Sequence, residues 1–120
     1  MRVLYVDDDR VNAMLFEEVC RAGGIEVACA EAGAEALVVA AAFAPELLVI
    51  DLHLPDATGY ELLPRLRALP GLAAVPAVLC TADDPVEVQM PARAAGFDTC
   101  WAKPVDLQAL QRQIERVAGR

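Results

Sequence analysis

The stretch 47–50 consists of four consecutive apolar residues and ends abruptly at the carboxylate of Asp51. An uninterrupted apolar run of this length is typical of a strand buried on both faces, as strands of parallel sheets are. Pro55, Asp56 and Gly59 follow closely and indicate a loop beyond the strand. In open α/β sheets, ligands bind in the crevice outside the carboxyl ends of the strands. The position of Asp51 therefore favours a role in chemistry over a role in packing.

Strand-like and helix-like segments alternate along the whole chain. We expect strands at residues 2–6, 25–30, 47–50, 76–80 and 98–102. We expect helices at 10–22, 33–44 and 60–69, a short helix that starts near Pro91, and a last helix capped by Asp106. Such alternation predicts a parallel sheet with helices on both faces and right-handed crossovers. The predicted fold is a doubly wound, flavodoxin-like α/β sheet of order 2-1-3-4-5, with residues 1–120 forming one domain.

The core-facing side of each helix is predicted from the spacing of its apolar residues. The inward residues expected in the first helix are Val11, Leu15, Val19 and Ala22, and those in the second are Leu37, Val38 and Ala41. In the last helix they are Leu107, Leu110, Ile114 and Val117. Pro64 and Pro91 each remove one backbone hydrogen bond, so the first should bend its helix and the second should shorten its helix.

Composition excludes several classes of function. A net charge of -8 argues against nucleic acid and anionic membrane surfaces as direct partners. The chain has no serine, which excludes serine hydrolases, and no apolar run approaches the roughly 18 residues of a membrane span. The four cysteines lack metal-type spacing and lie in apolar segments, as is expected of reduced thiols in a cytoplasmic protein. Cys80 and Cys100 stand on neighbouring predicted strands, which leaves a redox pair open as a minor alternative.

Five polar residues follow predicted strands and should meet at one edge of the sheet. They are Asp7, Asp8, Asp51, Thr81 and Lys103, of which Lys103 is the only lysine in the chain. Carboxylates placed this closely repel one another unless a cation offsets them, and oxygen ligands suit Mg²⁺. An ammonium and a hydroxyl beside a carboxylate nucleophile, with a divalent cation, make up a phosphoryl-transfer site. The small Ala82 after Thr81 would let a backbone N–H approach a phosphoryl oxygen.

In these motifs the chain resembles, from end to end, the receiver domain of two-component response regulators. The motifs are the acidic pair Asp7-Asp8 after a strand, Asp51 within D-L-H-L-P-D-A-T-G, Thr81-Ala82, and Lys103-Pro104. Each motif is common on its own, but all of them together, in this order, are highly specific. The stretches 96–98 and 103–106 are similar to those of receivers in hybrid histidine kinases.

The resemblance implies that Asp51 accepts a phosphoryl group from a phosphohistidine on a histidine kinase or a histidine phosphotransfer protein. It implies Mg²⁺, or alternatively Mn²⁺, bound directly by Asp8 and Asp51, through water by Asp7, and by the backbone carbonyl of His53. Thr81 and Lys103 would then engage the phosphoryl oxygens. Such a domain promotes its own phosphorylation and dephosphorylation and is not a conventional turnover enzyme.

The resemblance also implies an output surface, formed by the fourth helix, the fifth strand and the fifth helix, that signals to a downstream protein. The domain would act as a monomer or as a phosphorylation-linked dimer. Two residues depart from the family pattern here. Cys100 stands where the family has an aromatic residue that changes rotamer, and the neighbouring Trp101 should face the other side of the sheet. Pro91 falls in the fourth helix, so this surface is either altered or secondary to phosphate transfer.

Other functions remain as alternatives. A haloacid-dehalogenase-type phosphatase also uses an aspartate nucleophile, but it has a second aspartate at the position that His53 occupies here. A flavin carrier of the flavodoxin type shares the fold, but the acidic stretch 7–9 would repel the flavin phosphate. A receiver-like interaction module that signals without phosphorylation is the third possibility. A separate hypothesis places the ring of His53 over the site, where it tunes phosphoryl hydrolysis together with Asp83.

Overall fold

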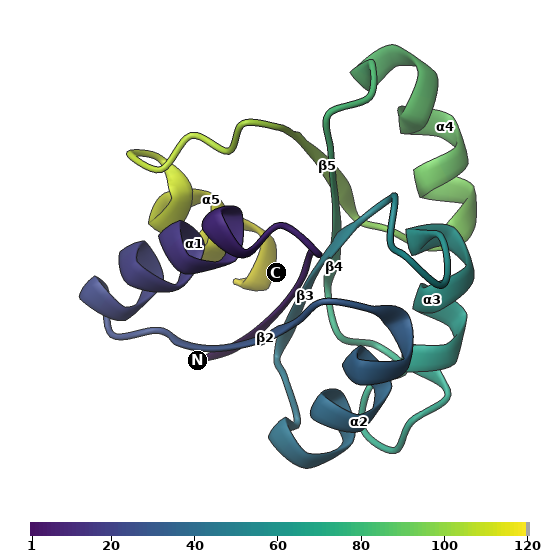
Figure 1. Ribbon diagram of the computed structural model, residues 1–120, viewed down its shortest axis with the longest axis horizontal. Coiled ribbons are helices and arrows are strands. Elements are labelled where there is room, and N and C mark those ends of the chain that lie inside the picture. The colour runs from purple at the N-terminus through teal and green to yellow at the C-terminus, as the bar shows by residue number, and fades with distance from the viewer. Residues whose placement is uncertain (120) are drawn as a thin grey trace.

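The structure is a computed structural model that describes residues 1–119, in which strands and helices alternate (Figure 1). The strands are β1 (Arg2–Val6), β2 (Glu26–Ala30), β3 (Leu47–Asp51), β4 (Ala77–Thr81) and β5 (Thr99–Ala102). The helices are α1 (Arg10–Ala22), α2 (Gly33–Phe43), α3 (Gly59–Arg67), α4 (Pro85–Ala95) and α5 (Leu110–Ala118). All strand pairs are parallel, and the sheet order β2-β1-β3-β4-β5 confirms the predicted topology. None of the helices in residues 1–119 has the length and apolarity that crossing a bilayer requires.

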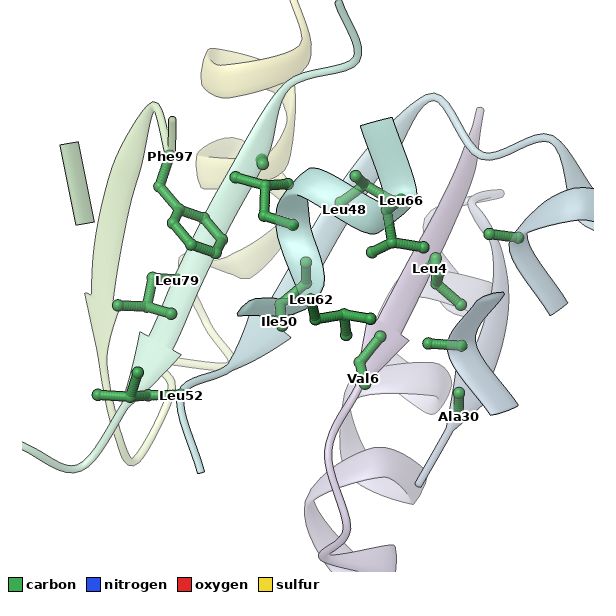
Figure 2. Close-up of a cluster of buried hydrophobic side chains, with 14 of the residues drawn as sticks. Leu4, Val6, Ala30, Leu48, Ile50, Leu52, Leu62, Leu66, Leu79 and Phe97 are labelled. Atoms are coloured by element: carbon green, nitrogen blue, oxygen red, sulfur yellow. The ribbon is translucent and has the colours of Figure 1, made fainter. Parts of the chain in front are cut away.

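Helices cover both faces of the sheet and enclose a separate core on each side. Helices α1 and α5 lie on one face, and α2, α3 and α4 lie on the other (Figure 1). The core under α2, α3 and α4 is drawn in Figure 2. Leu48, Ile50 and Leu79 of the sheet and Leu62 and Leu66 of α3 all contribute to it. Because β3 and β4 are covered on both faces, every residue in them is buried, which explains the uninterrupted apolar run before Asp51.

Helix α1 has its predicted bounds but rests on a different stripe of side chains. Asp9 caps it by accepting hydrogen bonds from the backbone N–H groups of residues 11 and 12. Its buried residues are Phe16 and Cys20. Of the predicted residues, Val19 packs partly buried against the core, whereas Val11 is 59% exposed and Leu15 is also exposed. An aromatic ring buries more apolar area than a leucine, and Phe16 stacks on Tyr5 of β1 with 4.1 Å between ring centroids. This stack therefore decides which side of the helix faces the sheet.

Helix α2 also turns a different side to the core than the one predicted. Its buried residues include Ala36 and Ala40. Of the predicted residues, Leu37 packs partly buried against the core, while Val38 is 73% exposed. Small side chains let the helix backbone approach the sheet closely, so alanine prevails over the bulkier valine. The helix lacks a cap from its own N-terminal flank, and Asp56 from the loop after β3 accepts hydrogen bonds from the N–H groups of residues 33 and 34.

Helix α4 is longer than predicted and runs through Pro91 from Pro85 to Ala95. Pro85 occupies the first helical turn, where a missing N–H costs nothing, and Asp84 accepts a hydrogen bond from the N–H of Val86. The ring of Pro91 is exposed, and the helix remains anchored through its buried residues Val88 and Ala92. The prediction of a short helix was wrong because a solvent-facing proline removes one hydrogen bond without removing the buried contacts.

The last helix begins at Leu110, later than the predicted cap at Asp106. The Asp106 carboxylate instead accepts hydrogen bonds from the N–H groups of residues 108 and 109, which close a turn before the helix. Leu110, Ile114 and Val117 are buried against the sheet as predicted, and residue 107 is partly buried. The turn gives the chain room to pass from the end of β5 to the start of α5.

One arginine links two loops at the amino-terminal edge of the sheet. The Arg67 guanidinium, at the end of α3, donates hydrogen bonds to the backbone carbonyls of Ala73, Val75 and Gly96 at 3.1, 2.8 and 3.0 Å. Gly96 ends α4 with a φ of 105°, a conformation that glycine adopts without strain. The clamp thus holds the carboxyl-terminal end of α4 on the loop between α3 and β4.

Candidate functional site

The four strands β1, β3, β4 and β5 bring their following residues to one edge of the sheet. Asp7 follows β1, Asp51 ends β3, Thr81 ends β4 and Lys103 follows β5. Asp7, Asp51 and Thr81 are buried, and Lys103 is partly buried. The sequence therefore placed these residues together correctly, because parallel strands end at the same edge.

Three carboxylates form a cluster at this edge. Asp7, Asp8 and Asp51 each offer one oxygen such that these oxygens lie within 4.8 Å of one another. Asp8 is exposed, while Asp7 and Asp51 are 1% and 8% exposed. Closely spaced carboxylate oxygens with one side open to solvent are hard ligands that fit a cation such as Mg²⁺, which retains several waters. The donor set therefore fits the predicted cation.

Lys103 joins the two buried carboxylates. Its Nζ lies 2.8 Å from Asp7 Oδ2 and 3.0 Å from Asp51 Oδ2. Burial alone would lower the pKa of Lys103, but the hydrogen bonds and charges of the two carboxylates outweigh it and raise the pKa. The ammonium is therefore held in its charged form between the two acids.

The two buried acids have different surroundings. Burial acts to raise the pKa of Asp7, but donors from Lys103, the Asp9 backbone and Tyr5 outweigh it, so the pKa is lowered. The Tyr5 hydroxyl donates to Asp7 Oδ2 at 2.8 Å and the Asp9 N–H donates to Oδ1 at 2.9 Å. Burial raises the pKa of Asp51, because Lys103 and a long hydrogen bond of 3.4 Å from the His53 N–H compensate less. Tyr5 is a site residue that sequence reasoning missed, although a tyrosine in an aliphatic strand was a visible signal.

Two loops beside the site are linked through His53 and Asp83. Thr81 Oγ1 accepts a hydrogen bond from the Asp83 N–H at 3.2 Å. The Asp83 carboxylate lies 2.8 Å from His53 Nε2, and both side chains are at the surface. The structure thus pairs the two residues that the sequence hypothesis grouped, and the pair connects the loop after β3 with the loop after β4.

Glycine is required where the loop after β3 turns back toward the strand. The Gly59 N–H donates to the Leu52 carbonyl at 2.8 Å. A Cβ at Gly59 would lie 2.8 Å from the Asp51 carbonyl oxygen, closer than real side-chain atoms approach backbone. The glycine of the D-L-H-L-P-D-A-T-G stretch therefore allows α3 to start directly against the strand that carries Asp51.

An open cleft of about 440 Å³ lies above the acidic cluster. Its lining includes all three clustered acids, Lys103 and Ala82. The exposed Ala82 leaves the cleft free of bulk on the β4 side. A small anion that entered would meet the Lys103 ammonium, and a cation beside the carboxylates would balance its charge. The cleft can therefore bring an anionic group to the Asp51 carboxylate.

A family model described as the response regulator receiver domain matches residues 3–115. The chain belongs to this family. It is 34% identical over 125 residues to the virulence sensor protein BvgS of Bordetella bronchiseptica, covering 100% of this chain and 10% of that protein. It is 33% identical over 120 residues to the sensor histidine kinase RcsC of Salmonella typhi, covering 100% of this chain and 12% of that protein. The receiver therefore spans about a tenth of the length of these curated relatives.

Solved structures of receivers have the same fold. A putative response regulator from Chloroflexus aurantiacus superposes with a TM-score of 0.90 at 33% identity, covering 99% of this chain and 98% of that chain. The receiver domain of the sensor histidine kinase PA1611 from Pseudomonas aeruginosa superposes with a TM-score of 0.87 at 28% identity, covering 99% and 98%. That structure has a magnesium ion coordinated in its active site cleft.

The residues that depart from the family pattern lie on α4 and β5. Cys100 is partly buried and lines a groove of about 200 Å³ between α4 and β5, together with Arg93 and Phe97. Trp101 is buried on the α1 and α5 side, as alternation along the strand predicts. Cys80 also belongs to that side, so Cys80 and Cys100 lie on opposite faces of the sheet. The alternative of a redox pair between these two cysteines is therefore excluded.

Proposed function

We propose that this receiver, as one domain, accepts a phosphoryl group on Asp51 from a phosphohistidine of a histidine kinase or a histidine phosphotransfer protein. The observation that carries the proposal is the Asp51 carboxylate, 3.0 Å from the Lys103 ammonium and beside two further acids. The relatives named as sensor proteins and the magnesium-bound receiver of a sensor kinase support it. The net charge of -8 argues against nucleic acid and anionic membranes as direct partners.

The transfer forms a bond between an Asp51 oxygen and phosphorus and breaks the bond between phosphorus and the histidine nitrogen of the donor. The electron pair of the broken bond returns to the imidazole. Lys103 and the Thr81 hydroxyl would hold the phosphoryl oxygens, with the Ala82 N–H as a further donor. Asp8, Asp51, the His53 carbonyl and, through water, Asp7 would hold Mg²⁺ or Mn²⁺. The cation supplies positive charge for the phosphoryl oxygens.

The phosphorylated domain would signal through the α4, β5 and α5 surface to a downstream protein, as a monomer or as a phosphorylation-linked dimer. Lys103 supports a link to this surface, because it stands between the site and the loop that leads to α5. Self-catalysed loss of the phosphoryl group would reset the domain, so the cycle does not resemble substrate turnover. A module that signals without phosphorylation is the competing function, favoured by Cys100 in the α4 groove.

Phosphorylation by a small-molecule donor separates these two functions. The protein is incubated with acetyl phosphate and Mg²⁺, and its intact mass is measured. We expect the wild type to gain one phosphoryl group and Asp51→Asn to gain none. Asp98→Asn is the matched control, because Asp98 precedes β5 at the opposite edge of the sheet and should leave the gain unchanged. No gain in the wild type would contradict the proposal and support the interaction module.

A further inference from the structure

We propose that Tyr5 is a positioning residue that sets how Asp7 takes part in cation binding. The inference rests on the proposed function, since it concerns the same cleft. Tyr5 is 2% exposed, and its hydroxyl reaches the acidic cluster from inside the core. The other residues of β1 between positions 3 and 6 are aliphatic, and they are as deeply buried. A phenylalanine would fill the same volume, so the only additional contribution of tyrosine is its hydroxyl bond to Asp7.

The hydrogen bonds of Asp7 show what this hydroxyl does. An ionised carboxylate has about four lone-pair positions, two on each oxygen. Oδ2 accepts from the Tyr5 hydroxyl and from Lys103 Nζ, both at 2.8 Å, so both of its positions are occupied. Oδ1 accepts from the Asp9 N–H at 2.9 Å and keeps one position. Tyr5 therefore leaves a single oxygen of Asp7 available to a cation or to one of its waters.

The position of the hydroxyl is itself fixed by packing. The Tyr5 ring stacks on Phe16 of α1, with 4.1 Å between centroids and 18° between ring planes. Phe16 is 1% exposed, so neither ring has room to turn away. A ligating carboxylate that is held by a rigid partner keeps its orientation before the cation arrives, and such outer partners commonly contribute about tenfold or more to metal affinity.

Removal of the hydroxyl should act on orientation rather than on charge. Tyr5→Phe leaves the ring stack and the net charge of the cluster unchanged. Asp7 then keeps Lys103 on Oδ2 and the Asp9 N–H on Oδ1, but it loses the one donor that the core packing holds rigidly in place. We therefore expect Mg²⁺ to bind more weakly, and we expect high Mg²⁺ concentrations to overcome the defect.

The experiment compares Tyr5→Phe with Tyr60→Phe, which removes the only other tyrosine hydroxyl of the chain. Tyr60 lies on α3, on the other side of the sheet from Phe16. Mg²⁺ affinity is measured by calorimetric titration without a phosphoryl donor, and the Asp9 amide proton is followed by NMR because it reports on Asp7 Oδ1. We expect affinity to fall about tenfold in Tyr5→Phe, with a shifted Asp9 resonance, and no change in Tyr60→Phe.

A kinetic measurement distinguishes positioning from a general structural defect. The rate of phosphorylation by acetyl phosphate should be reduced in Tyr5→Phe at low Mg²⁺ and should return to the wild-type rate at saturating Mg²⁺. Unchanged affinity in Tyr5→Phe, or a rate that saturating Mg²⁺ does not restore, would overturn the inference. If Asp51 is not phosphorylated in the wild type, the proposed function fails, while the calorimetric comparison still decides the role of Tyr5.

Discussion

Asp7 and Asp51 share one ammonium, yet their pKa values are shifted in opposite directions. Asp7 has three donors that outweigh its burial, whereas the donors of Asp51 do not compensate for burial. The difference lies in Tyr5 and Asp9, which serve Asp7 alone. The negative charge of Asp51, which would accept the phosphoryl group, is thus unfavourable in the folded protein. The negative charge of Asp7 is instead stabilised by its hydrogen-bond donors.

This contrast predicts opposite effects of two isosteric substitutions on the free energy of unfolding, measured at neutral pH with a chelator present. Because the pKa of Asp51 is raised in the folded state, its ionisation reduces stability as pH rises through the folded pKa, and Asp51→Asn should be more stable than the wild type. Because the pKa of Asp7 is lowered, its contribution is present above the unfolded pKa and is lost as pH falls through the folded pKa. Asp7→Asn should therefore be less stable.

Urea denaturation of both variants across the acidic range checks the two signs. The gain of Asp51→Asn over the wild type should shrink as pH falls and Asp51 becomes protonated. The loss of Asp7→Asn should shrink only at lower pH, where Asp7 itself is protonated in the folded protein. Two variants that shift stability in the same direction at neutral pH would contradict this account of the site.

Helix α4 combines an interior proline with an otherwise regular helix. Pro91 removes one backbone hydrogen bond, and its ring faces solvent, so no buried contact depends on it. An interior proline costs a helix about 3 kcal/mol relative to alanine. The carboxyl-terminal end of the helix is nevertheless fixed by Gly96, whose carbonyl the Arg67 side chain binds.

We predict that Pro91→Ala raises the free energy of unfolding by about 2 kcal/mol, because alanine restores the missing donor. Pro85→Ala is the matched control in the same helix. Pro85 lies in the first turn, where proline is favourable, so its replacement should bring no gain. Chemical denaturation measures both variants. A Pro91→Ala protein no more stable than the wild type would show that α4 requires the proline conformation.

The elements show which features the sequence could predict and which it could not. The strands and the site residues at their ends follow from local apolar runs and from the rule that parallel strands end together. The inward sides of α1 and α2 were predicted only in part: Val19 and Leu37 do pack against the cores. Both helices are apolar on several sides, and only contact with the sheet selects Phe16 or Ala36 as the buried residues. The hydrogen bonds of Arg67 to Gly96 and of Asp56 to the start of α2 join residues that are distant in sequence. Such contacts leave no periodic pattern in the sequence from which they could be predicted.

In the whole molecule, the sheet separates two hydrophobic cores, one on each of its faces, and we call this separation the partition. Cys80 belongs to the core under α1 and α5, whereas Cys100 contacts the core under α2, α3 and α4. Burial raises the pKa of Cys20 and of Cys80 to about 12. Burial also raises the pKa of Cys29, to about 11, and the pKa of Cys100, although both thiols are only partly buried.

These positions predict the pattern of thiol alkylation at neutral pH. In the folded protein, iodoacetamide should modify at most Cys29 and Cys100, and slowly, because little thiolate is present. In denaturant all four cysteines should react. Peptide mapping by mass spectrometry identifies the modified residues, and a mild oxidant tests the partition directly. A disulfide between Cys80 and Cys100 in the folded protein would contradict it.

The separation of the two cores also determines which structural changes tryptophan fluorescence can detect. Trp101 is the only tryptophan, and it is buried in the core under α1 and α5, paired in register with Cys80. Its emission will therefore follow rearrangements around α5 and the strand that leads to Lys103. A partner that settles in the groove beside Cys100, on the other face, would leave the indole in unchanged surroundings. Trp101 fluorescence would change on such binding only if the sheet itself moved. Binding without a change in fluorescence would therefore indicate a partner on the α4 side of the sheet.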